Sequence, residues 1–295
     1  MKVSTMIPFF ATILSRAPRS SSAFQPLLIV PTTTNAAAAA ANTRLFSSSP
    51  SSSSSTAMDN LTIQGPEIPP VSPSSKRLFL VRHGEVINPG GDRPVYYGAM
   101  DVSLSPLGQE EAKVAAEYLK QFDLQHVAAS PLSRAKFGAN EVLSRQQNLN
   151  TNNSNSELLK VYKGFTELDR GAWCGKTKDE IGAEMMARFD ACDESATPEG
   201  GESYPQLKER VLEARDELLN EMDCGKASAV VSHLQVTRCM LSDAHEIPTE
   251  EMCNFKIATA SVACIDYDSE TGSQTVHFQN FKPDVGLAQS KDGAN

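Results

Sequence analysis

Short apolar runs that alternate with helix starts are the feature of this sequence that most restricts its fold. The apolar run Leu78 to Val81 is followed by Ser105-Pro106, a helix cap with a first-turn proline. The same pattern recurs at His126 to Ser130 and at Ser130-Pro131. Because strands that alternate with helices favour a parallel sheet covered on both faces, we expect an α/β fold of three α/β/α layers with a mostly parallel central sheet.

The second half of the sequence continues this alternation. Glu157 to Tyr162 is a candidate strand, and a long amphipathic helix follows the turn at Pro198 to Ser203. Ala227 to Ser232 is a fully apolar strand, after which a helix is expected from about Gln235. Two closing strands flank the polar turn Asp268 to Ser273.

The chain divides into segments of different composition. Residues 1–58 contain no Asp or Glu, are rich in Ser, Thr and Ala, and carry only basic charges, which is typical of a disordered targeting presequence or transit peptide. Residues 59–77 are rich in Pro and Ser and are interpreted as a linker. We expect one folded domain at residues 78–287 and a C-terminal tail at residues 288–295.

The presequence carries two possible addresses. Ser20 to Pro26 resembles the Ala-Phe cleavage motif of plastid presequences in algae with complex plastids, whereas Thr43 to Ser49 resembles a mitochondrial processing site. We expect a plastid (chloroplast) location, with the mitochondrion as the alternative, and a low-complexity tail without an address stays open. The apolar stretch Thr5 to Leu14 is too short to span a bilayer, so no membrane partner is expected.

The composition excludes several classes of partner and cofactor. The formal net charge is -9 and no run rich in Lys and Arg occurs, so nucleic acid is not an expected partner. The 5 histidines and 6 cysteines form no HExxH, CxxC or Cys/His cluster, which predicts neither a metal site nor a disulfide framework. No cofactor is expected, and the oligomeric state stays open.

Charged side chains follow several of the predicted strands. Arg82 and His83 come directly after the first strand, Arg134 comes soon after the second, and His233 ends the strand at Ala227 to Ser232. Glu167 follows the third candidate strand at a greater distance. Because ligands of doubly wound sheets bind at the carboxyl ends of the strands, we expect the site at this edge.

A series of motifs around these residues resembles the histidine phosphatase superfamily, which is phosphoglycerate mutase-like. VRHGE with Asn88 resembles RHGE(T/S)xxN, LSPLGQEEA resembles LTxxGxxQA, and SPLSRA resembles SPLxRAxxTA. FTELDRGAWCGKT resembles LxExxxGxWEG, and GGES with VVSHLQVTR resembles the GES and VSHGxxIR motifs. The resemblance covers about Leu78 to Asp284 and implies a phosphoglycerate mutase-like fold.

The resemblance also implies a role for each charged residue. His83 would accept a phosphoryl group as phosphohistidine, while Arg82 and Arg134 hold the phosphoryl oxygens with forked guanidinium groups. His233 would donate a hydrogen bond to the transferring group. Glu167 would protonate the leaving oxygen and later deprotonate water.

Further contacts to the substrate are expected from Asn88, from the backbone near Gly98 and from Leu234. Two positions depart from the family pattern. Val86 stands where the family has Thr or Ser, so a hydroxyl contact is missing. Leu234 stands where the family has Gly after the second histidine, which narrows the space over the phosphate.

Several carboxylates near these motifs are open to another role. Either Glu167 or Asp169 could neutralise Arg170 instead of transferring a proton. Glu85 and Glu202 are interpreted as partners of the arginines or of substrate hydroxyl groups.

The resemblance implies a metal-independent phosphoric monoester hydrolase, of the histidine acid phosphatase type, that acts on a small phosphorylated metabolite. The mutase pattern typically has ERHYG after the acid and a longer, basic insertion, whereas this chain has ELDRGAWCG and the short acidic stretch Asp190 to Gly200. We therefore expect a phosphatase. A phosphoglycerate mutase is one alternative, and a catalytically weak homologue that binds a phosphorylated ligand is another, which Val86 and Leu234 allow.

Overall fold

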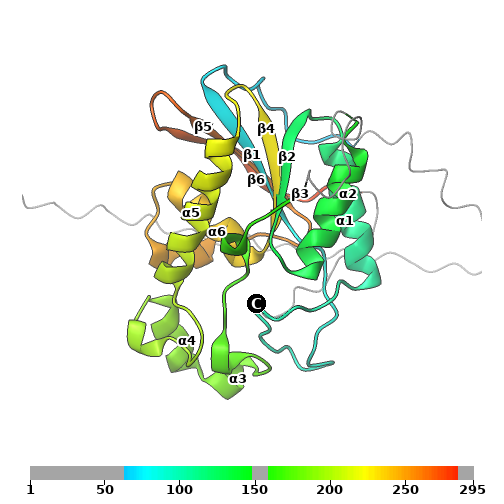
Figure 1. The fold of residues 1–295 in the computed structure, drawn as a ribbon. Coiled ribbons are helices and arrows are strands. Elements are labelled where there is room, and N and C mark those ends of the chain that lie inside the picture. Colours follow the sequence, from blue (N-terminus) through cyan, green and yellow to red (C-terminus); the bar gives the residue numbers. More distant parts are fainter. Residues whose placement is uncertain (1–62, 148–158, 285–295) are drawn as a thin grey trace, which may run out of the picture. The chain divides into compact units, whose positions relative to one another are not determined.

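A computed structural model describes residues 63–147 and 159–284, which all belong to the second of two units of the chain, Ser55–Asn295. A 6-stranded sheet has the strand order β3-β2-β4-β1-β5-β6 (Figure 1). Strands β1, β2, β3 and β4 run parallel, β5 is antiparallel to β1, and β6 is antiparallel to β5. The strands are β1 (Ser75–Arg82), β2 (Leu124–Ala129), β3 (Leu159–Val161), β4 (Ala227–Ser232), β5 (Val262–Asp268) and β6 (Gln274–Phe281).

Helices cover both faces of this sheet. Helices α1 and α2 lie on one face and α5 and α6 on the other, while α3 and α4 lie beyond one end of the sheet (Figure 1). The predicted three-layer α/β/α fold with a mostly parallel sheet is therefore confirmed. The helices are α1 (Pro106–Leu119), α2 (Ser133–Arg145), α3 (Lys178–Ile181), α4 (Ala183–Asp190), α5 (Tyr204–Glu221) and α6 (Leu234–Ala244).

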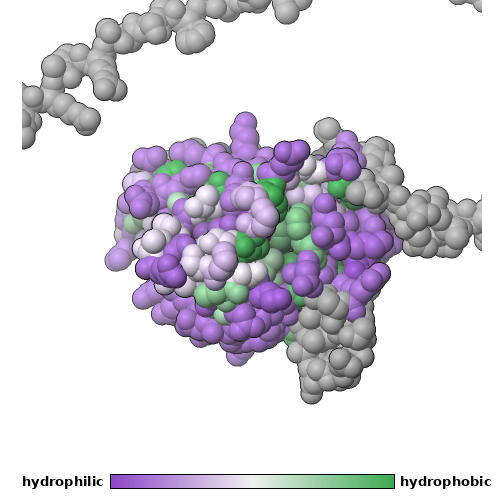
Figure 2. Space-filling view, turned by 90° about the horizontal axis from the view of Figure 1, so that it is seen from above, coloured by the Kyte–Doolittle hydropathy of each residue, from purple (hydrophilic) through white to green (hydrophobic). Residues whose placement is uncertain are grey.

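Strand β1 supplies apolar side chains to both layers, because successive side chains of a strand point to opposite faces. Leu78 and Leu80 pack with residues of α5 and α6, whereas Phe79 and Val81 pack with residues of α1 and α2. Each such burial stabilises the fold by about 1.5–3 kcal/mol. On the face shown in Figure 2, hydrophilic residues predominate and hydrophobic residues occupy small areas.

The two predicted helix starts have different outcomes. At α1, the Ser105 hydroxyl accepts a hydrogen bond from the Gly108 N–H at 3.0 Å and Pro106 occupies the first turn, as predicted. Helix α2 begins only at Ser133, and its cap residue Leu132 makes no side-chain capping bond. The prediction that Ser130 caps this helix is wrong, because its hydroxyl is bound in the site described below.

The described part of the predicted linker packs against the domain. Strand β1 begins at Ser75, before the predicted start of order, and the side chain of Ile63 is buried against residues of α1. The buried guanidinium of Arg77 donates to both carboxylate oxygens of Asp266, at 2.6 and 2.7 Å, and to the Pro69 carbonyl at 2.9 Å. Because a buried charge needs such partners, this segment is held in place and is not a linker.

The predicted presequence (residues 1–58) and the predicted tail (residues 288–295) lie outside the described residues. The plastid or mitochondrial address therefore stays a prediction. Within the described ranges, no helix combines the length and the apolar character that crossing a bilayer requires.

Candidate active site

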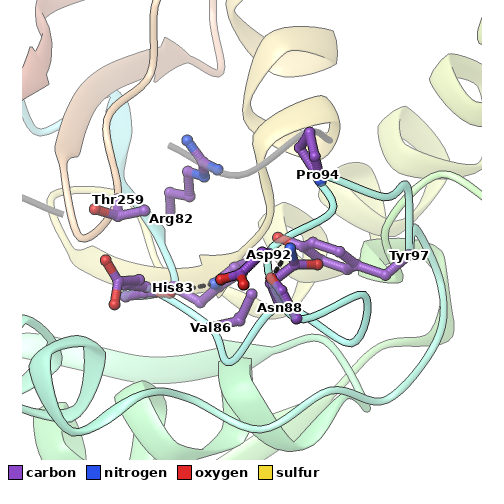
Figure 3. Close-up of a pocket in the computed structure, with 11 residues that line it drawn as sticks. Arg82, His83, Val86, Asn88, Asp92, Pro94, Tyr97 and Thr259 are labelled. Carbon is purple, nitrogen blue, oxygen red and sulfur yellow. Dashed lines mark hydrogen bonds between the residues drawn. The ribbon is translucent and has the colours of Figure 1, made fainter. Parts of the chain in front are cut away.

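A cavity of about 410 Å³ opens directly after strand β1, whose last residue is Arg82. This is the carboxyl edge of the parallel strands, where the sequence places the site. Figure 3 shows the cavity and its residues. They are Arg82, His83, Gly84, Glu85, Val86, Asn88, Gly91, Asp92, Pro94, Tyr97 and Thr259.

The imidazole of His83 is held in one orientation. Its Nδ1 lies 2.7 Å from the carbonyl oxygen of Gly84. A carbonyl oxygen can only accept, so Nδ1 carries the proton and Nε2 keeps its lone pair. The Nε of Arg134 donates to this Nε2 at 3.3 Å. The nitrogen that keeps its lone pair is thus the one that faces Arg134.

The guanidinium of Arg134 is fixed by backbone carbonyls. It is 1% exposed and donates to Met100 at 2.6 Å and to Gly98 at 2.7 Å. Gly98 has φ +40°, and a Cβ there would lie 2.3 Å from the Leu168 carbonyl oxygen, so glycine is required. The Gly98 carbonyl therefore orients Arg134, and the neighbouring Tyr97 lines the cavity, so a substrate contact from the backbone near Gly98 stays a prediction.

Arg82 lines the cavity and is anchored at one end. One terminal nitrogen of its buried guanidinium donates to the Ile257 carbonyl at 2.6 Å. The neighbouring Val86 also lines the cavity and pairs with Leu104 across an isolated bridge. Arg134 contacts His83 and Arg82 lines the same cavity as His83, so both guanidinium groups lie near the imidazole, and the phosphate-binding role of the pair stays a prediction.

His233 completes this group from the end of β4. Its ring is fully buried, and the ring centroid lies 5.1 Å from that of His83. Its Nε2 is 2.7 Å from the hydroxyl oxygen of Ser130, which also accepts the Leu132 N–H at 3.3 Å. Its Nδ1 has no hydrogen-bond partner among the described residues. A buried polar atom without a partner is typical of a site that binds a ligand.

Both imidazoles have a strongly lowered pKa. Burial lowers the pKa of His83 well below its ordinary value, and the charges of Arg134 and Arg82 lower it further. Burial, followed by Arg134 and His83, has the same effect on the pKa of His233. Both rings are therefore neutral near pH 7, which leaves the lone pair of His83 available for attack.

Glu167, like Arg134 and His233, is not one of the residues that line the cavity. Its carboxylate is 1% exposed and accepts the Leu168 N–H at 2.7 Å and the Gln235 N–H at 3.3 Å. The second donor belongs to the first turn of α6, where the helix dipole favours a negative charge. Burial lowers the pKa of Arg134, and the charge of Glu167 opposes that effect, so the two groups interact.

An ion pair fixes the loop that carries Glu167. Arg210 pairs with Glu202, and its guanidinium also donates to the carbonyls of Gly164, at 2.8 Å, and Glu167, at 3.2 Å. Glu202 in turn accepts the Asp169 N–H at 2.9 Å. The interpretation of Glu202 as a partner of an arginine agrees with this geometry.

The alternative that Glu167 or Asp169 neutralises Arg170 finds no support in the geometry. The Arg170 guanidinium lies over the aromatic rings of Tyr96 and Phe189, at 4.7 and 5.4 Å from their centroids. Glu167 has the partners named above, and the Asp169 side chain accepts the Gly171 N–H at 2.9 Å.

Two expected substrate contacts have other places in the structure. Asn88 lines the cavity, but its amide nitrogen donates to the carbonyls of Gly91 and Arg93, at 2.8 and 2.6 Å, so it braces its own loop. Leu234 is the first residue of α6, and its side chain packs in the core between the sheet, α5 and α6. It is not among the residues that line the cavity, and its effect on substrate range stays a prediction.

Sequence reasoning missed Glu111 and its partners. The Glu111 carboxylate is 3% exposed and accepts the Glu85 N–H at 2.8 Å, the Thr259 hydroxyl at 3.1 Å and the Lys282 ammonium at 2.6 Å. A signal was present, because Glu111 occupies the Gln position of the LTxxGxxQA-like motif. Ser130 was also missed, although it follows β2, the neighbour of the strand that ends before His233.

The described residues do not have the arrangement that metal ligands require. Across residues 63–147 and 159–284, no group of at least 3 His, Cys, Asp or Glu side chains is arranged to hold a metal ion.

Comparisons with known proteins identify the family of this chain. The model of the histidine phosphatase superfamily (branch 1) matches residues 78–280. Phosphoserine phosphatase 1 of Hydrogenobacter thermophilus is 28% identical over 193 residues, which are 64% of this chain and 85% of that protein. A 2,3-bisphosphoglycerate-dependent phosphoglycerate mutase of Cytophaga hutchinsonii is 24% identical over 207 residues, which are 68% of this chain and 92% of that protein.

A solved structure has the same fold. A mycobacterial glucosyl-3-phosphoglycerate phosphatase superposes with a TM-score of 0.57 at 23% sequence identity, over 70% of this chain and 99% of that chain. The superfamily match covers more than half of the chain and spans His83, Arg134, Glu167 and His233. The chain therefore belongs to the histidine phosphatase superfamily, branch 1.

Proposed function

We propose that this protein is a metal-independent phosphomonoester hydrolase that works through a phosphohistidine at His83 on a small phosphorylated metabolite. One observation carries the proposal: the His83 Nε2 keeps its lone pair beside the Arg134 guanidinium, in a cavity that Arg82 also lines. A neutral nucleophile beside forked cations is what transfer of a phosphoryl group requires.

In the first step, Arg82 and Arg134 bind the nonbridging oxygens of the substrate phosphate. The His83 Nε2 attacks phosphorus, the bond to the leaving oxygen breaks, and Glu167 in its acid form gives that oxygen a proton. In this step the ring of His233 carries its proton on Nδ1, and its Nε2 accepts a hydrogen bond from the Ser130 hydroxyl. Nδ1 then donates to the transferring group, where it gains the partner that it lacks in the protein.

In the second step, water attacks the phosphohistidine. The Glu167 carboxylate accepts a proton from this water, the bond between Nε2 and phosphorus breaks, and inorganic phosphate leaves. His83 is then neutral and Glu167 is protonated again, so the cycle is closed. The intermediate divides one difficult displacement into two easier ones.

Hydrolysis is favoured over the mutase reaction by the charge of the cavity. Arg82 is its basic lining residue, and Glu85 and Asp92 add carboxylates, whereas a mutase must hold a product with further anionic groups. The similarity to both phosphatases and a phosphoglycerate mutase makes this a choice between related reactions. The narrower class of histidine acid phosphatase stays a prediction.

The test is hydrolysis of p-nitrophenyl phosphate with a chelator present, with a parallel assay for isomerisation of 3-phosphoglycerate. We expect phosphate release that disappears in His83→Ala and persists in Lys113→Ala, a change at the surface of α1. Equal turnover by wild type and His83→Ala would refute the proposal. Isomerisation of 3-phosphoglycerate without phosphate release would assign the mutase reaction instead, and binding without turnover would assign a ligand-binding protein.

A further inference from the structure

The lining of the cavity carries charges of both signs. Arg82, from the end of β1, is the basic residue among its described lining residues, whereas Glu85 and Asp92 are carboxylates. Asp92 belongs to the loop that runs from Asn88 to Pro94 along one side of the cavity (Figure 3). A substrate that places its phosphate at Arg82 and His83 therefore extends past a negatively charged wall.

The backbone on both sides of Asp92 is fixed. The Asn88 amide nitrogen donates to the carbonyl of Gly91 at 2.8 Å and to that of Arg93 at 2.6 Å, the residues before and after Asp92. The Gly90 N–H donates to the Asn88 amide oxygen at 3.1 Å. The loop therefore presents the Asp92 carboxylate with little further loss of conformational freedom when a ligand binds.

The basic residue nearest in sequence does not neutralise Asp92. Arg93 donates to both carboxylate oxygens of Glu180, each at 2.7 Å, and Glu180 is itself held by the capping box of α3. Within the part of the chain that the structure describes, the Asp92 carboxylate has no ion-pair or hydrogen-bond partner. Its charge is therefore available to a ligand.

Three other side chains of the wall, those of Asn88, Thr259 and Glu85, offer a ligand acceptors more readily than donors. The amide protons of Asn88 are used by its own loop, and the Thr259 hydroxyl donates to Glu111 at 3.1 Å. The Glu85 carboxylate accepts the Ser105 hydroxyl at 2.8 Å. A leaving group with a positive charge and hydrogen-bond donors matches this wall, and a second anion is repelled by it.

We infer that Asp92 selects phosphomonoesters whose leaving group carries an ammonium group and disfavours those with a second anionic group. The inference rests on the proposed function, since it concerns the leaving group of the same reaction. Asp92 acts here on specificity, while His83, Arg82 and Arg134 act on the phosphoryl group common to all substrates.

Three substrates of similar size test this inference. Phosphoethanolamine carries an ammonium group, 2-hydroxyethyl phosphate a hydroxyl group and phosphoglycolate a carboxylate. For the wild type we expect kcat/KM to fall in that order. Asp92→Asn should lower kcat/KM for phosphoethanolamine by roughly two- to fivefold relative to 2-hydroxyethyl phosphate, the range for an exposed ion pair. Asp92→Lys should favour phosphoglycolate.

Two controls, higher ionic strength and a matched variant, distinguish an electrostatic effect of Asp92 from a structural effect of its replacement. Raising the ionic strength from about 0.05 M to about 0.5 M should shrink the preference of the wild type for phosphoethanolamine, because screening weakens an exposed ion pair. Glu209→Gln, which removes an exposed charge from α5, should leave the ratios of the three substrates unchanged.

Several results would overturn the inference. If Asp92→Asn changes all three substrates by the same factor, or if the wild type prefers phosphoglycolate, Asp92 does not select the leaving group. If p-nitrophenyl phosphate is hydrolysed in a His83-dependent reaction while the three ratios stay flat, this inference fails and the proposed function stands. If no phosphomonoester is hydrolysed, both fail.

Discussion

Glu111 and His83 bind the two ends of one peptide unit. The N–H of Glu85 donates to the Glu111 carboxylate at 2.8 Å, and the carbonyl of Gly84, in the same peptide unit, accepts the His83 Nδ1–H at 2.7 Å. A carboxylate on the N–H side polarises the peptide and strengthens its carbonyl as an acceptor. Lys282, 2.6 Å from Glu111, balances the buried charge.

Replacing Glu111 should therefore slow the chemical step more than it weakens binding. In Glu111→Gln a neutral amide replaces the carboxylate, and the loss of about 1 kcal/mol of charge-assisted hydrogen bonding should lower kcat about fivefold with little change in KM. Steady-state kinetics with p-nitrophenyl phosphate measures this. Glu110→Gln, next to it on α1 and paired with Lys113 at the surface, is the control. Equal kcat values in the two variants would contradict the role of Glu111.

Ser130→Ala should disturb His233 without touching the nucleophile. The variant leaves the buried His233 Nε2 without its partner at 2.7 Å, which should cost about 1–3 kcal/mol of stability. Because the contact that positions the His233 ring is then lost, kcat should fall as well. Urea unfolding and steady-state kinetics measure both effects, and Ser144→Ala near the end of α2 serves as the control. If Ser130→Ala has the same kcat as the wild type, Ser130 has no role in the reaction.

Substrates whose leaving groups differ in their need for a proton show whether Glu167 or Asp169 is the acid. If Glu167 protonates the leaving oxygen, Glu167→Gln should slow alkyl phosphates by about a hundredfold or more, and p-nitrophenyl phosphate, whose leaving group needs little protonation, by clearly less. Asp169→Asn is the matched control, since Asp169 is exposed and its side chain accepts the Gly171 N–H at 2.9 Å. A loss of the same size for both substrates in Glu167→Gln would argue against an acid role.

Stability should decline as the pH falls through the ordinary range of histidine. Burial and neighbouring charges lower the pKa of His83 and His233 well below the ordinary value of 6.5, so the folded chain binds fewer protons than the unfolded chain. Stability is then fully present above that value and is lost below it. Each ring should reduce the free energy of unfolding by about 1.2 kcal/mol between about pH 7 and about pH 5.5.

Urea unfolding in a buffer without phosphate measures this pH dependence. Burial also lowers the pKa of His126, so wild type and variants share that contribution. His83→Asn should show a shallower decline than the wild type, whatever its absolute stability. An unchanged slope would mean that His83 is not held neutral by the fold.

Local sequence signals predict most of the helices and strands. The predictions that fail concern residues whose hydrogen-bond partners lie far away in the sequence. Ser105 and Pro106 act within one helical turn, so a single-sequence reading finds that helix start. Ser130 has the same local pattern, but its partner His233 lies 103 positions away. Only the placement of β2 beside β4 brings the two together, and no local pattern encodes that placement.

In the site, too, some features follow from local sequence and others depend on the tertiary structure. The order of motifs placed His83, Arg82, Arg134 and His233 at one edge, because each follows a strand of the same sheet. The place of Asn88 depends on the conformation of its own loop. The Pro and Ser content of residues 59–77 predicts a linker, because no local pattern reveals the ion pair that joins Arg77, inside β1, to Asp266, 189 positions away.

The most direct test is to identify the group that carries the phosphoryl. Wild-type protein is mixed with p-nitrophenyl phosphate, quenched in base, where phosphohistidine survives, and analysed by peptide mass spectrometry. The account predicts a phosphoryl group on His83 that forms at least as fast as steady-state turnover, and none in His83→Asn. A phosphoryl group on another residue, or full turnover in His83→Asn, would contradict it.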